Sequence, residues 1–382
     1  MKQLSAIHRA SLIFLVFVLL GASCAKDPDR SSSGSGGTGG AGATGGTGGT
    51  GGTSGGGGGP LGPAGLPIPP GPDNVPVPSG TPGNLKVLNW AGFKSALTYT
   101  FDDAQPSQIE HYAELQATGV RHTFYITTGS GSGSTFDATF SQAVRDGHEM
   151  GNHTVHHCHS DLSGCSNGSA TSVDAELDDC TSTIISHFGQ SAVWTAASPF
   201  GDTGWDAPDM TRFFINRGVG SGTIGANDNT DPFNLPCHGA VEGEAAASFN
   251  SAIDAADTAG RWLIFLIHTI SPTGANWYAP IDVSVITDSV AHAKSLGDVW
   301  IDSVANVGAY WRAQKVLTSV TPAAAGGAQT WTWTLPAHFP PGMVLRITVD
   351  GGTPSQNGAP LSWDPHGYYE IALDARSLTL SP

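Results

Sequence analysis

The stretch Ala96-Leu97-Thr98-Tyr99-Thr100-Phe101-Asp102-Asp103 is a short run of apolar and β-branched residues that ends in two adjacent acids. Such a run predicts a buried strand over Ala96 to Phe101. In α/β proteins, the groups that carry out chemistry lie beyond the carboxyl ends of the strands. We therefore expect Asp102 and Asp103 to lie where an active site would be, although aspartates also commonly form turns after strands.

Other strands and helices are expected to follow in alternation. Apolar runs predict further strands over 121–127, 191–195 and 262–267. Helices are expected between them, over 107–117, 136–145, 172–187, 208–216, 245–259 and 283–295. This alternation across residues 85–317 predicts an α/β domain with a parallel sheet, either a closed barrel or a doubly wound sheet.

The N-terminal residues are typical of export followed by a tether. Residues 1–25 combine basic residues, an apolar run and small residues before Cys24, as a secretory signal peptide does. The small residues resemble a bacterial lipoprotein box, so we expect a cell-envelope lipoprotein anchored through Cys24, or a protein secreted after cleavage behind Ala25. Residues 26–84 are rich in Gly, Ser and Thr and then in Pro, and predict a linker that is first a flexible coil and then a stiffer spacer.

The charge balance excludes some partners. The 382 residues include 16 Lys and Arg against 32 Asp and Glu, which gives a formal net charge of -16. Such a chain repels nucleic acid and anionic membrane surfaces. We therefore expect a neutral or cationic partner, no nucleic acid, and membrane contact only through the lipid anchor.

The C-terminal residues 318–382 show a different pattern. Polar and apolar residues alternate there over 330–335, 344–349, 368–373 and 377–380, without helical stretches. This predicts a small β-rich unit. Its aromatic residues more often form a core, but they could instead stack on sugar rings; they are Trp331, Trp333, Trp363 and Tyr368.

A second polar stretch, Gly151-Asn152-His153-Thr154-Val155-His156-His157, holds two histidines four residues apart. On a helical turn, His153 and His157 would lie on one face and point to the same place. Two imidazoles and one carboxylate would leave positions for water and substrate, as at a catalytic zinc site. Asp103 is the candidate third ligand. Taken alone, a histidine pair with this spacing is more often an accident of the surface.

Two further polar segments follow predicted strands. His268 comes directly after the run 262–267, although a single histidine there is more often structural. Ser198-Pro199-Phe200-Gly201 follows the strand expected at 191–195. Its backbone N-H groups could face a developing oxyanion.

Four cysteines follow the signal peptide, namely Cys158, Cys165, Cys180 and Cys237. An even number in an exported protein predicts two disulfides, with three connectivities to choose from. No pair has the two-residue spacing typical of zinc ligands. A bridge at Cys158 would brace the neighbouring histidine stretch.

Together these motifs resemble the polysaccharide deacetylase family, the NodB-like carbohydrate esterase family four, over about residues 87–314. Thr100-Phe101-Asp102-Asp103 resembles its first motif, and His153-Thr154-Val155-His156-His157 resembles its second. Leu266-Ile267-His268 resembles its final motif. The resemblance implies a distorted (β/α)7 barrel with the small C-terminal all-β unit appended. It also implies metal-dependent removal of acetyl groups from a carbohydrate polymer.

The resemblance assigns roles to single residues. The divalent metal, Zn²⁺ or Co²⁺, would be held by Asp103, His153 and His157. Asp102 would be the general base, His268 the general acid, the Phe200 N-H an oxyanion donor and Asp231 a support for His268. One feature differs: where the family's third motif often has an arginine that orients the base, Thr195 to Phe200 contains none. Asp102 is therefore expected to be held in some other way.

Alternatives stay open at this point. An N-acetylglucosamine-containing glycan is the favoured substrate, with O-acetyl xylan as the other candidate. Gly164-Cys165-Ser166-Asn167-Gly168 fits the pattern of a serine esterase, but that motif needs a buried strand before it and a helix after it. A carbohydrate-binding protein with a degenerate deacetylase site is the third alternative.

Overall fold

The computed structural model describes residues 60–129, 135–271 and 278–382. The expected signal peptide, Cys24 and the Gly-rich half of the linker lie outside these residues. Within them, no helix combines the length and the apolar character needed to cross a membrane.

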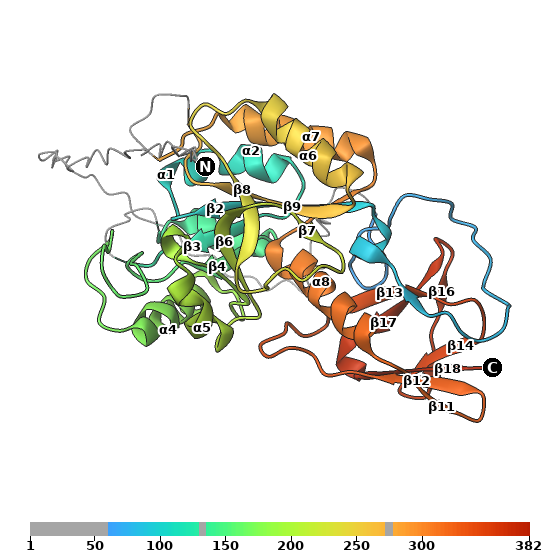
Figure 1. Cartoon of the computed structure of the whole chain (residues 1–382). Coiled ribbons are helices and arrows are strands. Elements are labelled where there is room, and N and C mark those ends of the chain that lie inside the picture. The colour runs from blue at the N-terminus through green and yellow to red at the C-terminus, as the bar shows by residue number, and fades with distance from the viewer. Residues whose placement is uncertain (1–59, 130–134, 272–277) are drawn as a thin grey trace, which may run out of the picture. The chain divides into compact units, whose positions relative to one another are not determined.

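The centre of the fold is a barrel of seven parallel strands (Figure 1). In order around the barrel, the strands are β2 (Ser95–Asp102), β3 (Thr123–Ile126), β4 (Glu149–Asn152), β5 (Thr195–Ala197), β6 (Ile215–Ser221), β8 (Leu235–Gly239) and β9 (Arg261–Ile267). Strand β9 pairs back with β2, from Ala96 opposite Trp262 to Phe101 opposite Ile267, and this closes the barrel. The expected α/β class is confirmed, and of its two forms the closed barrel is the observed one.

Strand β2 has three neighbours, which distorts the barrel. Along one edge it pairs with β9. Along the other edge, Ser95 to Leu97 pair with β10 (Val299–Ile301), and Thr100 to Asp102 pair with β3. A short antiparallel strand, β7 (Ile224–Gly225), pairs with the first two residues of β9.

Helices surround the barrel, and most begin and end close to the predicted residues (Figure 1). They are α1 (Pro106–Glu110), α2 (Tyr112–Ala117), α3 (Ala138–Arg145), α4 (Val173–Thr183), α6 (Ala246–Thr258) and α7 (Val283–Leu296). The side chain of Ser172 accepts the N-H of Ala175, and thus caps α4.

The helix predicted over 208–216 is wrong from residue 211 onward. Helix α5 ends at Met210, and β6 begins at Ile215. Phe213, Phe214 and Ile215 are all buried, and such aromatic and β-branched residues favour a strand. Strand β5 begins at the last residue of its predicted range, while β4, β8, β10 and the long helix α8 (Val304–Ser319) were not predicted.

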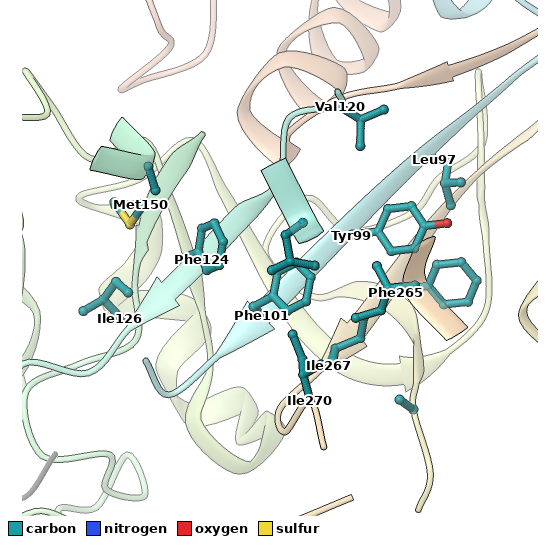
Figure 2. Close-up of a cluster of buried hydrophobic side chains, with 14 of the residues drawn as sticks. Leu97, Tyr99, Phe101, Val120, Phe124, Ile126, Met150, Phe265, Ile267 and Ile270 are labelled. Carbon is teal, nitrogen blue, oxygen red and sulfur yellow. The ribbon is translucent and has the colours of Figure 1, made fainter. Parts of the chain in front are cut away.

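Apolar side chains fill the space between the barrel and its helices (Figure 2). Phe101 and Phe124 on neighbouring strands stack with ring centroids 5.2 Å apart, and both are fully buried. Burial of one such side chain contributes about 1.5–3 kcal/mol. The strand ends that carry Asp102 and Asp103 therefore rest on a packed support.

The C-terminal residues form two antiparallel sheets, as expected. One sheet has the order β1-β13-β17-β16, with β1 (Lys86–Val87), β13 (Val344–Thr348), β17 (Tyr368–Ala372) and β16 (Trp363–Asp364). The other has the order β11-β12-β18-β14-β15, with β11 (Ala323–Ala325), β12 (Ala328–Thr332), β18 (Ser377–Ser381), β14 (Thr353–Gln356) and β15 (Ala359–Pro360). Trp331, Trp333 and Tyr368 are buried, which assigns them to the core rather than to a sugar-binding surface.

The proline-rich residues 60–84 differ from the expected spacer because they are held against the C-terminal sheets. Buried Arg346 donates to the carbonyl oxygens of Leu66 and Pro67, at 3.3 and 2.7 Å. Trp363 donates its indole N-H to Val75 O at 2.8 Å. Strand β1 also pairs with β13, so residues on both sides of the predicted boundary at 85 contribute to the C-terminal unit.

Candidate active site

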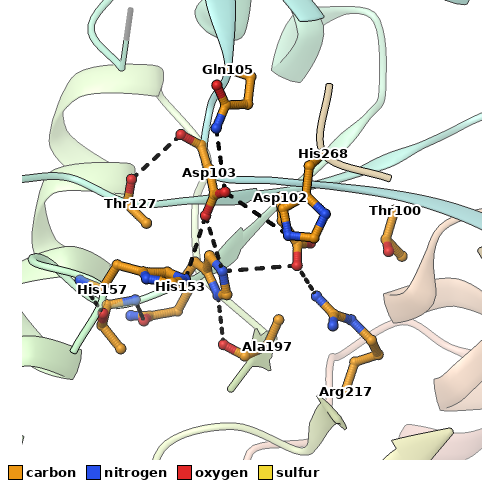
Figure 3. A network of polar contacts seen from close by, with 12 residues as sticks. Thr100, Asp102, Asp103, Gln105, Thr127, His153, His157, Ala197, Arg217 and His268 are labelled. Carbon is orange, nitrogen blue, oxygen red and sulfur yellow. Dashed lines mark hydrogen bonds and ion pairs between the residues drawn. The ribbon is translucent and has the colours of Figure 1, made fainter. Parts of the chain in front are cut away.

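Three polar segments follow three strands at one end of the barrel (Figure 3). Asp102 is the last residue of β2 and Asp103 follows it, with its N-H donating to Tyr125 O at 3.0 Å. His153 follows β4 and His268 follows β9. All of these strands are parallel, so their carboxyl ends meet, as the sequence predicts.

Asp103, His153 and His157 form a compact set of ligand atoms. Asp103 Oδ1 lies 3.4 Å from His153 Nε2 and 3.6 Å from His157 Nε2. One ligand atom from each residue lies within 4.8 Å of the others. The structure therefore brings together the three residues that the motifs suggested as metal ligands.

The two histidines converge without a helix, so the expected helical turn is wrong. Strand β4 ends at Asn152, whose side chain accepts the N-H of Thr154 at 2.8 Å. Thr154 and His157 both have left-handed backbone angles, with φ of 64° and 51°. The N-H of His157 donates to Thr154 Oγ1 at 3.0 Å. A tight turn, rather than helical spacing, directs both rings to one place.

The tautomer of His153 suits a cation. Its Nδ1 lies 2.8 Å from the carbonyl oxygen of Ala197, which can only accept, so Nδ1 carries the proton. Nε2 then has a free lone pair; it is buried and makes no hydrogen bond within the described part of the chain. A buried lone pair beside a carboxylate oxygen is a donor set that Zn²⁺ and related ions prefer, so these residues fit a divalent metal.

Charge in the site favours the metal-binding forms of Asp103 and His157. Burial alone would raise the pKa of Asp103, but the neighbouring His153, His268 and His157 bring it below its ordinary value. Burial, and then the nearby His153, lower the pKa of His157 to about 4. His157 is therefore neutral and Asp103 ionised at neutral pH, which are the forms that bind a metal.

Arg217 supplies the cation that is absent between Thr195 and Phe200. It lies on β6, directly opposite Ala197 of β5, and is fully buried. Its Nη2 contacts Asp102 Oδ2, and its Nη1 donates to Gly218 O at 3.1 Å. The neighbouring strand thus holds Asp102 in place, as Figure 3 shows. The sequence carries one signal for it, a single charged residue within the run Phe213 to Val219.

The structure does not bring Asp231 to His268. The Asp231 side chain accepts the N-H of Phe233 at 2.9 Å, and so caps the turn before β8. His268 lies near Asp103 instead, with 4.0 Å between Nε2 and Oδ2. Among the residues described, its buried Nδ1 has no hydrogen-bond partner.

Phe200 lies at the edge of the site. It is in the short 3-10 turn Pro199–Gly201, has φ of 58°, and is half exposed. Its ring lies 4.4 Å from that of His157 and stacks on His159 at 4.3 Å, measured between centroids. Phe200 lines a cavity of about 410 Å³ together with Tyr278, His268 and the three candidate ligands. Cavities of this size suit small ligands or parts of larger ones.

One disulfide braces the histidine segment. Cys158, next to His157, is bonded to Cys165. Cys180 and Cys237 are buried and free, so the prediction of two disulfides is wrong for the cysteines described here. Cys180 lies on α4 and Cys237 on β8, each against a backbone carbonyl oxygen.

The serine esterase motif lacks its structural setting. Gly164 to Gly168 lie in an irregular loop, with neither a strand directly before Ser166 nor a helix directly after it. The sharp strand-to-helix turn that exposes a nucleophilic serine is therefore missing.

These observations define a (β/α)7-barrel protein with a candidate metal centre at the carboxyl ends of its strands. Residues 92–212 match the family model described as polysaccharide deacetylase. This segment contains Asp102, Asp103 and the two candidate histidine ligands, but not His268, so the resemblance carried by the first two motifs is confirmed. The likeness to the polysaccharide deacetylase family is thus carried by this segment.

Several solved structures are similar to this chain at low identity. PdaA of Bacillus subtilis, a family 4 carbohydrate esterase, is 14% identical over 60% of this chain and 84% of its own, with a TM-score of 0.39. A family 4 acetyl xylan esterase from Clostridium thermocellum, solved with a cobalt ion, is 18% identical over 56% and 89%, with a TM-score of 0.36. No curated protein matches the chain. The barrel is therefore defined by its own strand pairing rather than by these likenesses.

Proposed function

We propose that this protein is a hydrolase that depends on a divalent cation and removes acetyl groups from a carbohydrate. The observation that supports this best is the convergence of Asp103, His153 and His157 in one cavity with the buried Asp102 and the partly buried His268. The ligand set alone would fit many metal proteins. Its combination with a candidate base and a candidate acid fits hydrolysis.

The metal would be held by Asp103 Oδ1 and the Nε2 atoms of the two histidines. When bound, such a cation acidifies water and polarises an acyl oxygen. Asp102 receives the proton of the attacking water, and its contact with Arg217 fixes the direction in which its oxygens point. A positioned general base contributes about 10²- to 10⁴-fold to the rate.

His268 faces the same cavity and is assigned transfer of a proton to the departing amine or alcohol. Burial, only partly opposed by Asp102 and Asp103, lowers its pKa. Once protonated, its imidazole therefore gives the proton up readily. The backbone N-H of Phe200 is the proposed donor to the oxyanion.

The substrate we propose is an N-acetylglucosamine-containing glycan, with O-acetyl xylan as the alternative. Both present an acetyl carbonyl group beside a vicinal hydroxyl. A panel of N- and O-acetylated polymers, assayed for released acetate, separates the two. Release from none of them would instead support a carbohydrate-binding protein.

Metal dependence has its own test. Purified protein should carry about one divalent ion, and removing it with a chelator should abolish acetate release until Zn²⁺ or Co²⁺ is restored. Full activity after exhaustive chelation would refute this proposal and support a serine esterase.

We also propose that the protein is exported and anchored through a lipid on Cys24. This rests on the signal-like residues 1–25 alone. The protein should partition with membranes, and Cys24→Ser should release it or block its maturation. A mature N-terminus at Lys26 would instead establish plain secretion.

A further inference from the structure

We propose that Ser166, which lies outside both histidine and aspartate motifs, is a positioning residue that orients the His157 ring for a divalent cation by accepting its Nδ1 proton. The inference rests on the proposed function, because it concerns the same metal site. It assigns Ser166 to support of a ligand rather than to nucleophilic attack.

The contact lies on the far side of the His157 ring. Ser166 Oγ is 3.4 Å from His157 Nδ1, whereas His157 Nε2 faces Asp103 Oδ1 at 3.6 Å. A neutral imidazole carries one proton, so a ring that offers Nε2 to a cation must carry that proton on Nδ1. A serine hydroxyl can accept it. Ser166 thus provides an acceptor for the Nδ1 proton of the tautomer that binds metal, and orients the ring.

The other histidine is held in the same manner. His153 Nδ1 donates to Ala197 O at 2.8 Å, and its Nε2 faces Asp103. Partners of this kind fix the orientation of a ligating ring and strengthen its basicity. His153 takes its partner from a barrel strand. His157 takes its partner from a loop, so that loop needs separate support.

The disulfide provides this support. Cys158 directly follows His157, and Cys165 directly precedes Ser166. The bond between the two cysteines therefore holds Ser166 close to His157. The N-H of Ser166 also donates to His156 O and His157 O, at 3.1 and 3.3 Å. Ser166 is therefore fixed to His157 by its own backbone and by the covalent bridge beside it.

The test measures metal affinity, which a purely structural serine would leave unchanged. Metal-free protein is titrated with Zn²⁺ and with Co²⁺ by calorimetry, for the wild type, Ser166→Ala and Ser166→Thr. Loss of an outer partner of a metal ligand typically weakens affinity by about 10- to 100-fold. We expect about a tenfold weaker Kd in Ser166→Ala and a value near the wild type in Ser166→Thr, which keeps the hydroxyl. Ser163→Ala is the matched control, because Ser163 is an exposed serine of the same disulfide-closed loop.

Each outcome has a distinct meaning. Weaker binding in Ser166→Ala, with acetate release that recovers as Zn²⁺ is raised, supports the proposal. A Kd within twofold of the wild type for both metals overturns it. Normal metal binding together with activity that no metal concentration restores also overturns it, because Ser166 would then act on a step other than metal binding. A wild-type protein that binds neither metal refutes the proposed function itself, and with it this inference.

Discussion

Arg217 and Asp102 are 115 residues apart in the sequence and in direct contact in the barrel, both almost completely buried. Burial leaves both charges poorly solvated, so each depends on the other. Removal of one partner of a buried pair costs about 3–5 kcal/mol, because the remaining charge is uncompensated. This pair therefore combines two roles, orientation of the candidate base and stability of the barrel.

The first prediction concerns Arg217→Lys. The change keeps the positive charge but loses the planar group that fixes a carboxylate, so the protein should fold while kcat falls about tenfold or more. Metal affinity should change little, because Arg217 touches none of the three candidate ligands. Steady-state kinetics, calorimetry and thermal unfolding measure these effects separately.

Arg212→Lys is the matched control for Arg217→Lys. Arg212 also pairs with aspartates, Asp174 and Asp178, but does so at the surface. Its replacement should leave kcat at the wild-type value. Equal losses of kcat in both variants would show that Arg217 has no special link to the base.

A second experiment should distinguish the roles of the adjacent aspartates Asp102 and Asp103. Asp103→Asn removes the anionic ligand oxygen, so both metal affinity and activity should fall. Asp102→Asn keeps the shape and loses the basicity, so the metal should stay bound while kcat falls by about 10²-fold or more. Metal analysis and rate measurements on both variants provide the check; loss of metal from Asp102→Asn alone would reverse the two assignments.

His268→Gln should reveal its role through the leaving group. If His268 protonates the departing group, its loss should slow hydrolysis of an acetamide or of an alkyl ester by about 10²-fold or more. It should slow phenyl acetates much less, because a phenolate leaves without a proton. Similar losses for both classes would contradict the role of general acid.

The free energy of unfolding should depend on pH through two histidines that lie outside the candidate site, His122 and His148. Burial lowers the pKa of His122 to about 3 and that of His148 to about 4. The backbone N-H of His122 donates to His148 Nδ1 at 2.9 Å. The ring atom His122 Nδ1 is buried, with no hydrogen-bond partner among the residues described. A second proton on either ring would therefore find no acceptor.

These lowered pKa values determine how the free energy of unfolding changes with pH. Between pH 4 and about 6.5 the unfolded chain binds protons at both histidines that the folded protein does not, so the free energy of unfolding falls as the pH is lowered. Each group contributes up to about 1.4 kcal/mol per pH unit. Urea unfolding from pH 7.5 to 4.5 should show a smaller slope for His122→Phe than for the wild type. His187→Gln, at an exposed position, should keep the wild-type slope.

Much of the fold follows from local patterns in the sequence. The runs that end at Phe101 and Ile267 combine length, burial and β-branched residues, and both form barrel strands. Strand β4 has only four residues, among them Gly151 and Asn152, and β8 contains Pro236. Such strands carry little local signal, because their stability comes from the neighbours with which they pair.

The residues of the candidate site also differ in how well local sequence patterns predict them. Asp103, His153 and His157 belong to short motifs whose residues are close in the sequence or follow recognisable strands. Arg217 and Ser166 act across the barrel or across a disulfide, so no local spacing reveals them. The register of β5 against β6 places Arg217 beside Ala197, and register is a property of the folded sheet.

Strand β2 pairs with three other strands. The candidate ligands therefore differ in how easily each can move away from a bound ion. Asp103 directly follows a strand that is buried along its whole length and bonded on both edges, so it can move away only when the barrel opens. His157 lies in a turn outside the strands, braced by the Cys158–Cys165 bond, and local opening of a turn costs less free energy than opening of the barrel. A bound ion would thus leave by a path that begins at His157. At high chelator concentration, the rate of ion loss should become independent of the chelator, because opening of that turn limits it.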